Sequence, residues 1–286
     1  MSRSSGRAAA PEARALVVSG FGINCDFETE YALNRAGARA ERVHVNALIE
    51  RCRTGDGLDP FHILAVDGGF SWADDHGAGV LLGLKLGSYL GDHLARFIEA
   101  GRLVMGICNG FQALVNMGLL PGLDRDYTAR SVALTANDCG NFRNDWVRLT
   151  VDPDTRCIYT RGIEALELPV RHGEGQFYAA PEIMARLQAA GQVALRYAGP
   201  DGRPAGGAFP ANPNGSLDDI AGICDPTGRI IGLMPHPEAF HHLTNHPHWT
   251  RDLDRLRRQG RSPETLDGDG LKLFRNAVAF VRECLL

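Results

Sequence analysis

The sequence predicts an α/β fold in which short buried strands alternate with helices and form a mostly parallel sheet covered on both faces. Two observations support this. Short apolar runs recur along the first half of the chain, and the segments between them carry apolar residues at helical spacing. Strands buried on both faces read as continuous apolar runs, and alternation with helices is typical of parallel sheets.

In the first half of the chain, strands are expected at residues 15–20, 42–45, 63–66 and 103–107. Helices are expected at residues 26–36, 89–100 and 111–117. The last of these helices is closed by Gly118 and Pro121, which are residues that end helices.

Beyond about residue 145 the pattern becomes β-rich, with strands expected at residues 146–151, 166–171, 193–197, 220–224 and 230–234. Pro226-Thr227-Gly228 predicts a hairpin turn between the last two strands. An amphipathic helix is expected at residues 270–284. We therefore expect a single domain over residues 13–286, preceded by a disordered tail at residues 1–12.

The composition excludes several classes of function. The chain has 286 residues, of which 44% are hydrophobic, and a formal net charge of -4. Because nucleic-acid-binding proteins generally carry a basic surface, no nucleic acid is expected as a partner. No apolar stretch is long enough for a signal peptide or a membrane span, so no membrane partner is expected. The seven cysteines are irregularly spread and form no C-x-x-C pair, which predicts a reduced, cytoplasmic location and no metal site.

Cys108 lies where the apolar run 103–107 meets a helix, between Gly106 and Gly110. This G-x-C-x-G form is the nucleophile-elbow pattern with cysteine in place of serine. The glycines permit a tight turn that presents the side chain above the sheet edge, and the helix N-terminus stabilises the thiolate. The alternative is a buried structural cysteine. The other six cysteines have no comparable context and are interpreted as bystanders.

His236 is the histidine that best suits a catalytic base. It follows the strand expected at 230–234, stands between Pro235 and Pro237, and precedes Glu238 by two residues. Near a strand end, side chains at i and i+2 project the same way, so Glu238 can fix the imidazole tautomer. Cys108, His236 and Glu238 are therefore the predicted catalytic triad; a rigid turn without chemistry is the alternative interpretation of Pro-His-Pro-Glu alone.

The loop Gly68-Gly69-Phe70-Ser71 follows the strand expected at 63–66. Acyl transfer requires donors for a tetrahedral oxyanion, and glycine-rich loops at strand ends let backbone N–H groups approach it. We expect the oxyanion to be bound by the N–H groups of Gly69 and Asn109. A glycine pair is weak evidence alone, because glycines end many strands.

Together and in this order, these three motifs resemble those of the class I glutamine amidotransferases. Further stretches resemble one branch of that family, the glutaminase subunits of phosphoribosylformylglycinamidine synthase; they lie at residues 118–122, 172–178, 212–216, 219–222 and 269–274. The resemblance extends from about Ala15 to the end of the chain. It implies the family's fold, a flavodoxin-like, mostly parallel sheet flanked by helices, with an additional β-rich half.

The resemblance also implies the roles of the site residues. Cys108 is expected to form the γ-glutamyl thioester, His236 to act as general base and acid, and Glu238 to orient it. The residues expected to shape the glutamine pocket are Gly68, Phe70, Ser71, Gln112, His172 and Glu174.

The implied enzyme is a glutaminase that hydrolyses L-glutamine and delivers ammonia to a large synthetase subunit, with a small accessory subunit as an optional further partner. The synthetase uses ATP to convert formylglycinamide ribonucleotide to formylglycinamidine ribonucleotide in de novo purine biosynthesis. This chain has no G-x-x-x-x-G-K-[ST] phosphate loop. We therefore expect no cofactor in this chain, and ATP and magnesium in the partner.

The chain also departs from the family pattern. Asp67 stands where proline usually precedes the glycine pair, Trp72-Ala73-Asp74 replaces tyrosine, glycine and aspartate, and Ala239 replaces an arginine. The largest departure is an apparent insertion at about residues 240–267, rich in histidine and arginine. Its histidines lack the Cys and carboxylate partners of a zinc site, so the alternatives are a solvated loop with a basic helical face and, as our hypothesis, a contact with the synthetase or its phosphates.

Two other functions remain compatible with the sequence. The triad motifs are shared by class I glutaminases that serve other synthetases, and stretches such as Asn109-Gly110-Phe111 and His172-Gly173-Glu174 favour the purine branch over these. A related cysteine hydrolase or a catalytically silent binding module with the same elbow is the alternative from another class.

Overall fold

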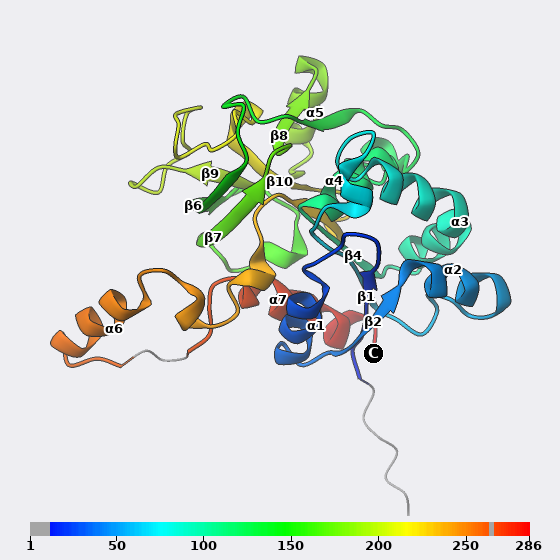
Figure 1. Cartoon of the computed structure of the whole chain (residues 1–286), viewed down its shortest axis with the longest axis horizontal. Helices are drawn as coiled ribbons and strands as arrows, with labels where there is room; N and C mark the ends of the chain where they lie inside the picture. Colours follow the sequence, from blue (N-terminus) through cyan, green and yellow to red (C-terminus); the bar gives the residue numbers. More distant parts are fainter. Residues whose placement is uncertain (1–11, 263–265) are drawn as a thin grey trace, which may run out of the picture.

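The structure of the protein is a computed structural model that describes residues 12–262 and 266–286. A nine-stranded sheet in the order β2-β1-β3-β4-β11-β10-β9-β6-β7 runs through the molecule (Figure 1). Its first five strands are mutually parallel: β2 (Arg39–His44), β1 (Arg14–Ser19), β3 (Ile63–Val66), β4 (Leu103–Ile107) and β11 (Ile230–Leu233). The parallel sheet predicted from the sequence is confirmed.

The β-rich half continues the same sheet with antiparallel strands. These strands are β10 (Ile220–Cys224), β9 (Val193–Ala198), β6 (Arg143–Val151) and β7 (Ala165–His172). Residues 226–228 turn the chain between β10 and β11, which pair antiparallel as the predicted hairpin requires. A separate two-stranded sheet is formed by β5 (Val132–Thr135) and β8 (Gln176–Ala179); neither of its strands was predicted.

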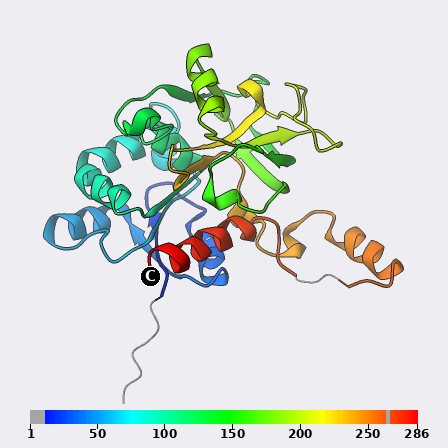
Figure 2. The ribbon, with the colours of Figure 1, turned by 180° about the vertical axis from the view of Figure 1, so that it is seen from behind.

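Helices cover both faces of the parallel strands. In the sheet, β2 lies on one side of β1, whereas β3 and then β4 lie on the other side. Because each crossover between parallel strands is right-handed, the helix after β1 covers one face of the sheet and the helices after β2 and β3 cover the opposite face. One layer contains α1 (Asp26–Arg35) and α7 (Leu271–Cys284), which pack together (Figure 2). The other contains α2 (Val45–Thr54), α3 (Val80–Glu99) and α4 (Asn109–Asn116).

Two of the boundaries that differ from the sequence prediction have a clear physical reason. The helix expected at 89–100 is the second half of α3, whose first half contains Gly83 and Gly87. Glycine weakens the helical signal in a sequence, but a Cβ at Gly83 would lie 2.8 Å from the carbonyl oxygen of Ala113, so this glycine lets α3 approach α4. Val45, predicted as the end of a strand, is the first residue of α2, where the His44 side chain accepts a hydrogen bond from the N–H of Asn46 and caps the helix.

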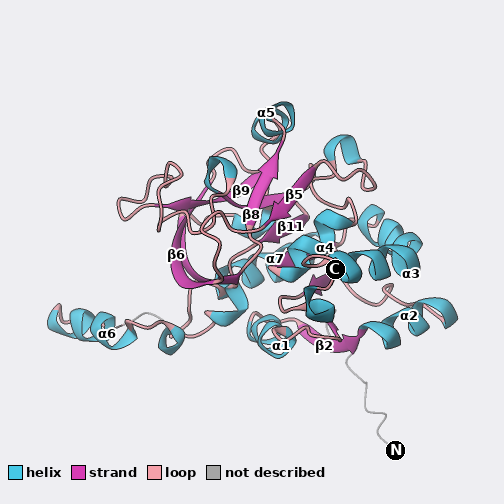
Figure 3. Ribbon diagram, turned by 45° about the horizontal axis from the view of Figure 1, so that its top comes forward, coloured by secondary structure: helices cyan, strands magenta, loops and turns pink. Residues whose placement is uncertain are grey.

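Two helices lie outside these layers. Helix α5 (Pro181–Ala189) follows β8, and α6 (Trp249–Arg258) lies in the predicted insertion and projects from the body of the protein (Figure 3). Apart from Glu12, the predicted tail at residues 1–12 lies outside the described residues, as do residues 263–265 of the predicted insertion. Among the described residues, no helix has the length and apolar character needed to cross a membrane.

Candidate active site

Cys108 occupies the corner between β4 and α4, as the elbow pattern predicts. Its backbone has φ 50 and ψ -107, a strained conformation for a residue with a side chain. The elbow lies directly against β3: a Cβ added at Gly110 would be 1.8 Å from the carbonyl oxygen of Val66, so only glycine fits there. The thiol is 5% exposed and donates a weak hydrogen bond to the carbonyl oxygen of Arg171 at 3.6 Å.

His236 and Glu238 lie together just beyond the end of β11, which pairs directly with β4. The Nδ1 atom of His236 and the Oε1 atom of Glu238 are 2.5 Å apart, and both side chains are almost completely buried. Burial alone lowers the pKa of His236, but the negative charge of Glu238, with a further contribution from Cys108, raises this pKa well above its ordinary value. Within the described part of the chain, Nε2 of His236 has no hydrogen-bond partner. The structure therefore brings the three predicted catalytic side chains into one interacting group.

A second thiol lies beside the catalytic imidazole. The Sγ atom of Cys25 is 3.8 Å from Nδ1 of His236 and donates a hydrogen bond to Oδ1 of Asn24 at 3.4 Å. Burial raises the pKa of Cys25 to about 11, so this residue remains a thiol at neutral pH. The sequence predicts Cys25 to be a bystander, because nothing local connects it with a histidine 211 residues away; its contact with His236 appears only in the structure.

The glycine loop after β3 is held against the loop after β1. The N–H of Phe70 donates to the carbonyl oxygen of Gly22 at 2.9 Å, and the N–H of Trp72 donates to that of Phe21 at 2.8 Å. Gly69 has φ +143 and faces Ile23 in an isolated bridge. These contacts fix the predicted oxyanion loop beside the site.

The side chain of Asn109 connects the glycine loop to the elbow. Its Oδ1 accepts from the N–H of Ser71 at 3.4 Å, and its Nδ2 donates to Asp74 at 2.9 Å and to Gln112 at 3.3 Å. Residues 72–74, where this chain departs from the family pattern, all adopt left-handed φ values. The backbone N–H of Asn109 is at the first turn of α4, where such groups have no partner within the helix and are available to an oxyanion.

The predicted pocket residues Gln112, His172 and Glu174 lie in a hydrogen-bonded network behind the elbow. Gln112 donates to the carbonyl oxygen of Glu174 at 2.5 Å, and Glu174 accepts from the N–H of Ala78 at 3.1 Å. The ring of His172 bonds Oδ1 of Asn137 at 3.1 Å. Burial, aided by the positive charge of His236, lowers the pKa of His172 to about 3, so this ring is neutral. These side chains position the loop that faces α4.

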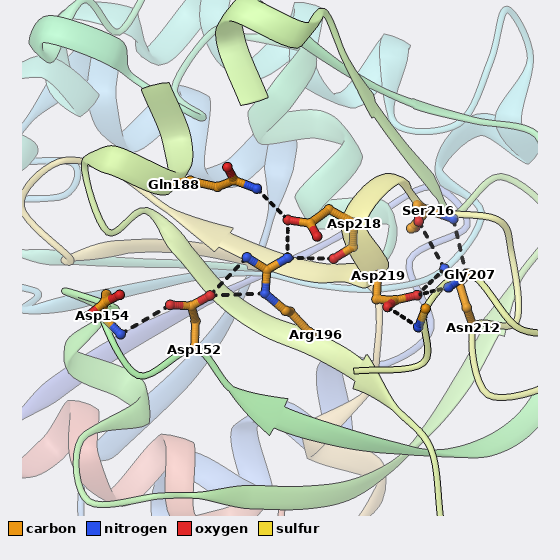
Figure 4. A network of polar contacts seen from close by, with 10 residues as sticks. Asp152, Asp154, Gln188, Arg196, Gly207, Asn212, Ser216, Asp218 and Asp219 are labelled. Carbon is orange, nitrogen blue, oxygen red and sulfur yellow. Dashed lines mark hydrogen bonds and ion pairs between the residues drawn. The ribbon is translucent and has the colours of Figure 1, made fainter. Parts of the chain in front are cut away.

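That loop is held in turn by residues 212–216, which the sequence singled out without giving them a role. Asn214 donates to the carbonyl oxygen of Gly175 at 2.8 Å, and Asn212 donates to Asp219 at 2.9 Å. Figure 4 shows how this segment continues into a polar network around Arg196, which binds Asp152 and Asp218. The network ties β9 to the loops that support the site.

Asp67, the departure next to the glycine pair, is completely buried. Neither of its carboxyl oxygens has a hydrogen-bond partner within the described part of the chain, and the same is true of Oε2 of Glu238. Burial raises the pKa of Asp67 well above its ordinary value, and the negative charge of Glu238 raises it further. The nearby hydroxyl of Thr29 opposes this rise only in part, because it does not reach hydrogen-bond geometry. Asp67 is therefore a neutral carboxylic acid behind the catalytic pair.

A cleft of about 470 Å³ opens onto this group. His236 and the predicted residues Gly69 and Phe70 line it, whereas Cys108 contacts its wall through Arg171. The remaining lining residues were not singled out from the sequence; they are Asn24, Cys25, Glu28, Phe142, Asn144 and Arg171. They come from three separate parts of the chain, at residues 24–28, 142–144 and 171, which a linear motif does not reveal.

A thiol at a strained elbow, an imidazole within its reach and a carboxylate on the far side of that imidazole define a cysteine-dependent acyl-transfer enzyme. The comparisons with known proteins agree with this class. Residues 12–281 match the family model of the CobB/CobQ-like glutamine amidotransferase domain.

Relatives match over nearly the whole chain. Phosphoribosylformylglycinamidine synthase subunit PurQ of Dehalococcoides mccartyi is 43% identical over 270 residues, which cover 94% of this chain and 98% of that protein. The subunit of the same name from Methanococcus maripaludis is 40% identical over 268 residues, which cover 93% of this chain and 97% of that protein. Among solved structures, a chain of PurLQS from Thermotoga maritima superposes with a TM-score of 0.66 at 28% identity, covering 95% of this chain and 100% of that chain.

The chain therefore belongs to the glutamine amidotransferase family and, within it, to the PurQ subunits of phosphoribosylformylglycinamidine synthase. The resemblance inferred from the sequence motifs and the fold that it implied are both confirmed.

Proposed function

We propose that this chain hydrolyses L-glutamine at Cys108 and supplies the ammonia to the large synthetase subunit of phosphoribosylformylglycinamidine synthase. The observation that carries this is the hydrogen bond between Glu238 and Nδ1 of His236, just beyond the end of β11, beside the elbow that presents Cys108 at the end of the neighbouring strand β4. The synthetase partner is inferred from the relatives, which are named as subunits of phosphoribosylformylglycinamidine synthase.

The chemistry follows from these positions. The thiolate of Cys108 attacks the side-chain carbonyl carbon of glutamine, and the N–H groups of Gly69 and Asn109 bind the resulting oxyanion. His236 gives its proton to the departing ammonia, leaving a γ-glutamyl thioester on Cys108. The imidazole then removes a proton from water, which hydrolyses the thioester and releases glutamate. Glu238 holds the ring in the required tautomer throughout.

The cleft offers complementary charges to an amino acid. Among its lining residues, Arg171 is a cation and Glu28 an anion, which suit the α-carboxylate and α-ammonium groups of a zwitterion. Phe70 and Phe142 stand at its mouth with ring centroids 6.1 Å apart. This arrangement fits a small polar substrate that enters from the surface.

The ammonia is used by the partner for the ATP-dependent conversion of formylglycinamide ribonucleotide to formylglycinamidine ribonucleotide. ATP and magnesium belong to the synthetase in this proposal, and a small accessory subunit is an optional third component. The setting is the cytoplasm, in keeping with seven cysteines that are all free in the structure.

The test is glutamine-dependent ammonia release by the chain and by its complex with the synthetase, with formylglycinamide ribonucleotide and ATP as acceptor substrates. We expect Cys108→Ala to abolish glutamine-dependent activity while the complex still uses free ammonia. The matched control is Cys52→Ala, which removes a buried thiol from α2. Activity with a different acceptor but not with formylglycinamide ribonucleotide would assign the chain to another synthetase, and glutamine turnover that survives Cys108→Ala would remove the mechanism.

A further inference from the structure

Three side chains that carry metal-binding atoms converge at the base of the cleft. Cys25 precedes α1, whereas His236 and Glu238 follow β11. One ligand atom from each lies within 4.8 Å of the others, and all three residues are buried. Within residues 12–262 and 266–286, this is the one group of at least three such side chains with that geometry.

We propose that Cys25, His236 and Glu238 form a binding site for a thiophilic divalent cation, for which Zn²⁺ fits best, and that the bound ion switches off the glutaminase. A sulfur, an imidazole nitrogen and a carboxylate oxygen form a mixed set that suits Zn²⁺, whereas Mg²⁺ and Ca²⁺ prefer oxygen ligands alone. The inhibitory part rests on the proposed function; the binding part does not.

The distances are close to those that a tetrahedral ion needs. With Zn–S of about 2.3 Å and Zn–N of about 2.0 Å, sulfur and nitrogen ligands are roughly 3.5 Å apart. The separation of Sγ of Cys25 and Nδ1 of His236 is 3.8 Å. The contact of 2.5 Å between Nδ1 and Oε1 of Glu238 has to open. The unpartnered Oε2 of Glu238 is a second oxygen that can turn toward the ion.

The site has an access route and room for a fourth ligand. Cys25 and His236 both line the 470 Å³ cleft, so an ion and a water molecule can reach them from solvent. Glu28 lines the same cleft and adds negative charge that attracts a cation. Before the ion binds, Asn24 accepts a hydrogen bond from the thiol of Cys25 and positions its sulfur.

Binding and catalysis exclude each other at the imidazole. When the ion binds, the thiol of Cys25 releases its proton to solvent, and His236 carries its remaining proton on Nε2 so that Nδ1 is free for the metal. The imidazole is then unable to accept a proton, and Glu238 no longer orients it. The thiol of Cys108 stays intact, so a chelator is expected to restore activity.

The first experiment measures binding without any enzyme assay. The purified full-length chain is titrated with ZnCl₂ against a chromophoric chelator, and with Co²⁺ while the thiolate-to-cobalt absorption is recorded. We expect one ion per chain. Cys25→Ala and the more conservative Cys25→Ser should weaken binding at least about tenfold. Cys108→Ala and the exposed-cysteine control Cys284→Ala should leave it unchanged.

The second experiment repeats glutamine hydrolysis at increasing Zn²⁺ for each variant. We expect reversible inhibition of the wild-type chain and, in Cys25→Ala, a midpoint at least about tenfold higher in Zn²⁺. Binding that depends on Cys108 and not on Cys25, or that is lost instead with His248→Ala in the predicted insertion, would overturn the site. A chain that binds Zn²⁺ through Cys25 but never hydrolyses glutamine would contradict the proposed function and leave the metal site standing.

Discussion

The backbone of Gly68 lies against the catalytic imidazole of His236. A Cβ added at residue 68 would be 2.7 Å from Cε1 and 3.3 Å from Nδ1 of His236. The φ of Gly68 is not in the left-handed region, so the requirement for glycine comes from space. The sequence assigned Gly68 to the glutamine pocket; the structure shows that it also fixes how closely the glycine loop approaches the base.

Gly68→Ala is therefore expected to displace the imidazole. A misplacement of about 1 Å costs on the order of 100-fold in rate, so kcat for glutamine hydrolysis should fall by about that factor with a smaller change in KM. The control is Gly173→Ala, where the nearest atom to an added Cβ is Cδ2 of Phe142 at 3.8 Å. If kcat fell equally in the two variants, the contact with His236 would not be the reason that residue 68 must be glycine.

Glu238→Gln tests the charge that holds His236 in place. Because the neutral amide of glutamine cannot balance the positive charge of the protonated imidazole, kcat should fall by about 10²- to 10⁴-fold. The same change should alter stability with pH. The pKa of His236 is raised in the folded protein, so its contribution to stability is complete below the unfolded value of about 6.5 and is lost as pH rises through the folded pKa.

The destabilisation of Glu238→Gln should accordingly be largest near pH 6 and shrink as pH rises to about 9. Urea unfolding at these pH values measures it. Glu41→Gln, which removes a surface ion pair with Arg51, is the control and should show no such trend. A destabilisation that grows with pH would contradict the raised pKa of His236.

The structure separates what the sequence reveals from what it does not. The elbow at Cys108 and the Pro-His-Pro-Glu segment are local patterns whose chemistry follows from adjacent residues, so the sequence alone predicts both the strained corner and the pairing of His236 with Glu238. The buried strands were predicted for the same reason. Helix α2 was missed although Val45, Leu48, Ile49 and Cys52 are buried at helical spacing, because its cap is a histidine and histidine is not a usual helix-start signal.

Cys25 and Asp67 show the opposite case. Cys25 contacts His236, and the charge of Glu238 influences the pKa of Asp67; both partners lie far along the chain and come near because β11 inserts beside β4 in the sheet. The sequence predicts only a pocket role for Glu174, whereas in the structure the backbone carbonyl of this residue also accepts a hydrogen bond from Gln112. Motifs identify which residues matter, but not which of them touch.

Asp67→Asn should stabilise the protein in neutral and alkaline solution. The pKa of Asp67 is raised by burial, so the favourable contribution of its neutral form is complete below the unfolded pKa of about 3.9 and is lost as pH rises through the folded value. Asparagine stays neutral throughout and keeps the shape. The gain should be on the order of 1–3 kcal/mol at pH 8 and close to zero at pH 4.

Denaturant titrations at both pH values test this, with the exposed Asp92→Asn on α3 as the control. A loss of stability at pH 8 would mean that Asp67 is ionised and paired in the folded protein.

The segment at 240–267 is predicted to contact the synthetase partner. His246 anchors its base: the ring is 6% exposed and lies with its centroid 4.5 Å from that of Trp146. Beyond this anchor, α6 has no buried residue and projects from the body (Figure 3). Arg255 and Arg258 are 63% and 80% exposed in their side chains. A basic helix held out from a rigid base is suited to a complementary acidic surface or to bound phosphates.

A double variant in which both Arg255 and Arg257 are replaced by glutamate should therefore bind the synthetase subunit about tenfold more weakly or worse. The loss should be largest at low salt, because exposed charges steer association and are screened by ions. Reversal is sharper than deleting residues 244–262, since deletion also removes His246 and its packing on Trp146. The control is Arg53→Glu on α2, an equally exposed arginine at 71%. Calorimetric titration of the two subunits measures the affinities. Glutamine hydrolysis by the isolated chain checks that each variant is folded. Equal affinity of the two variants for the synthetase would exclude α6 from the interface.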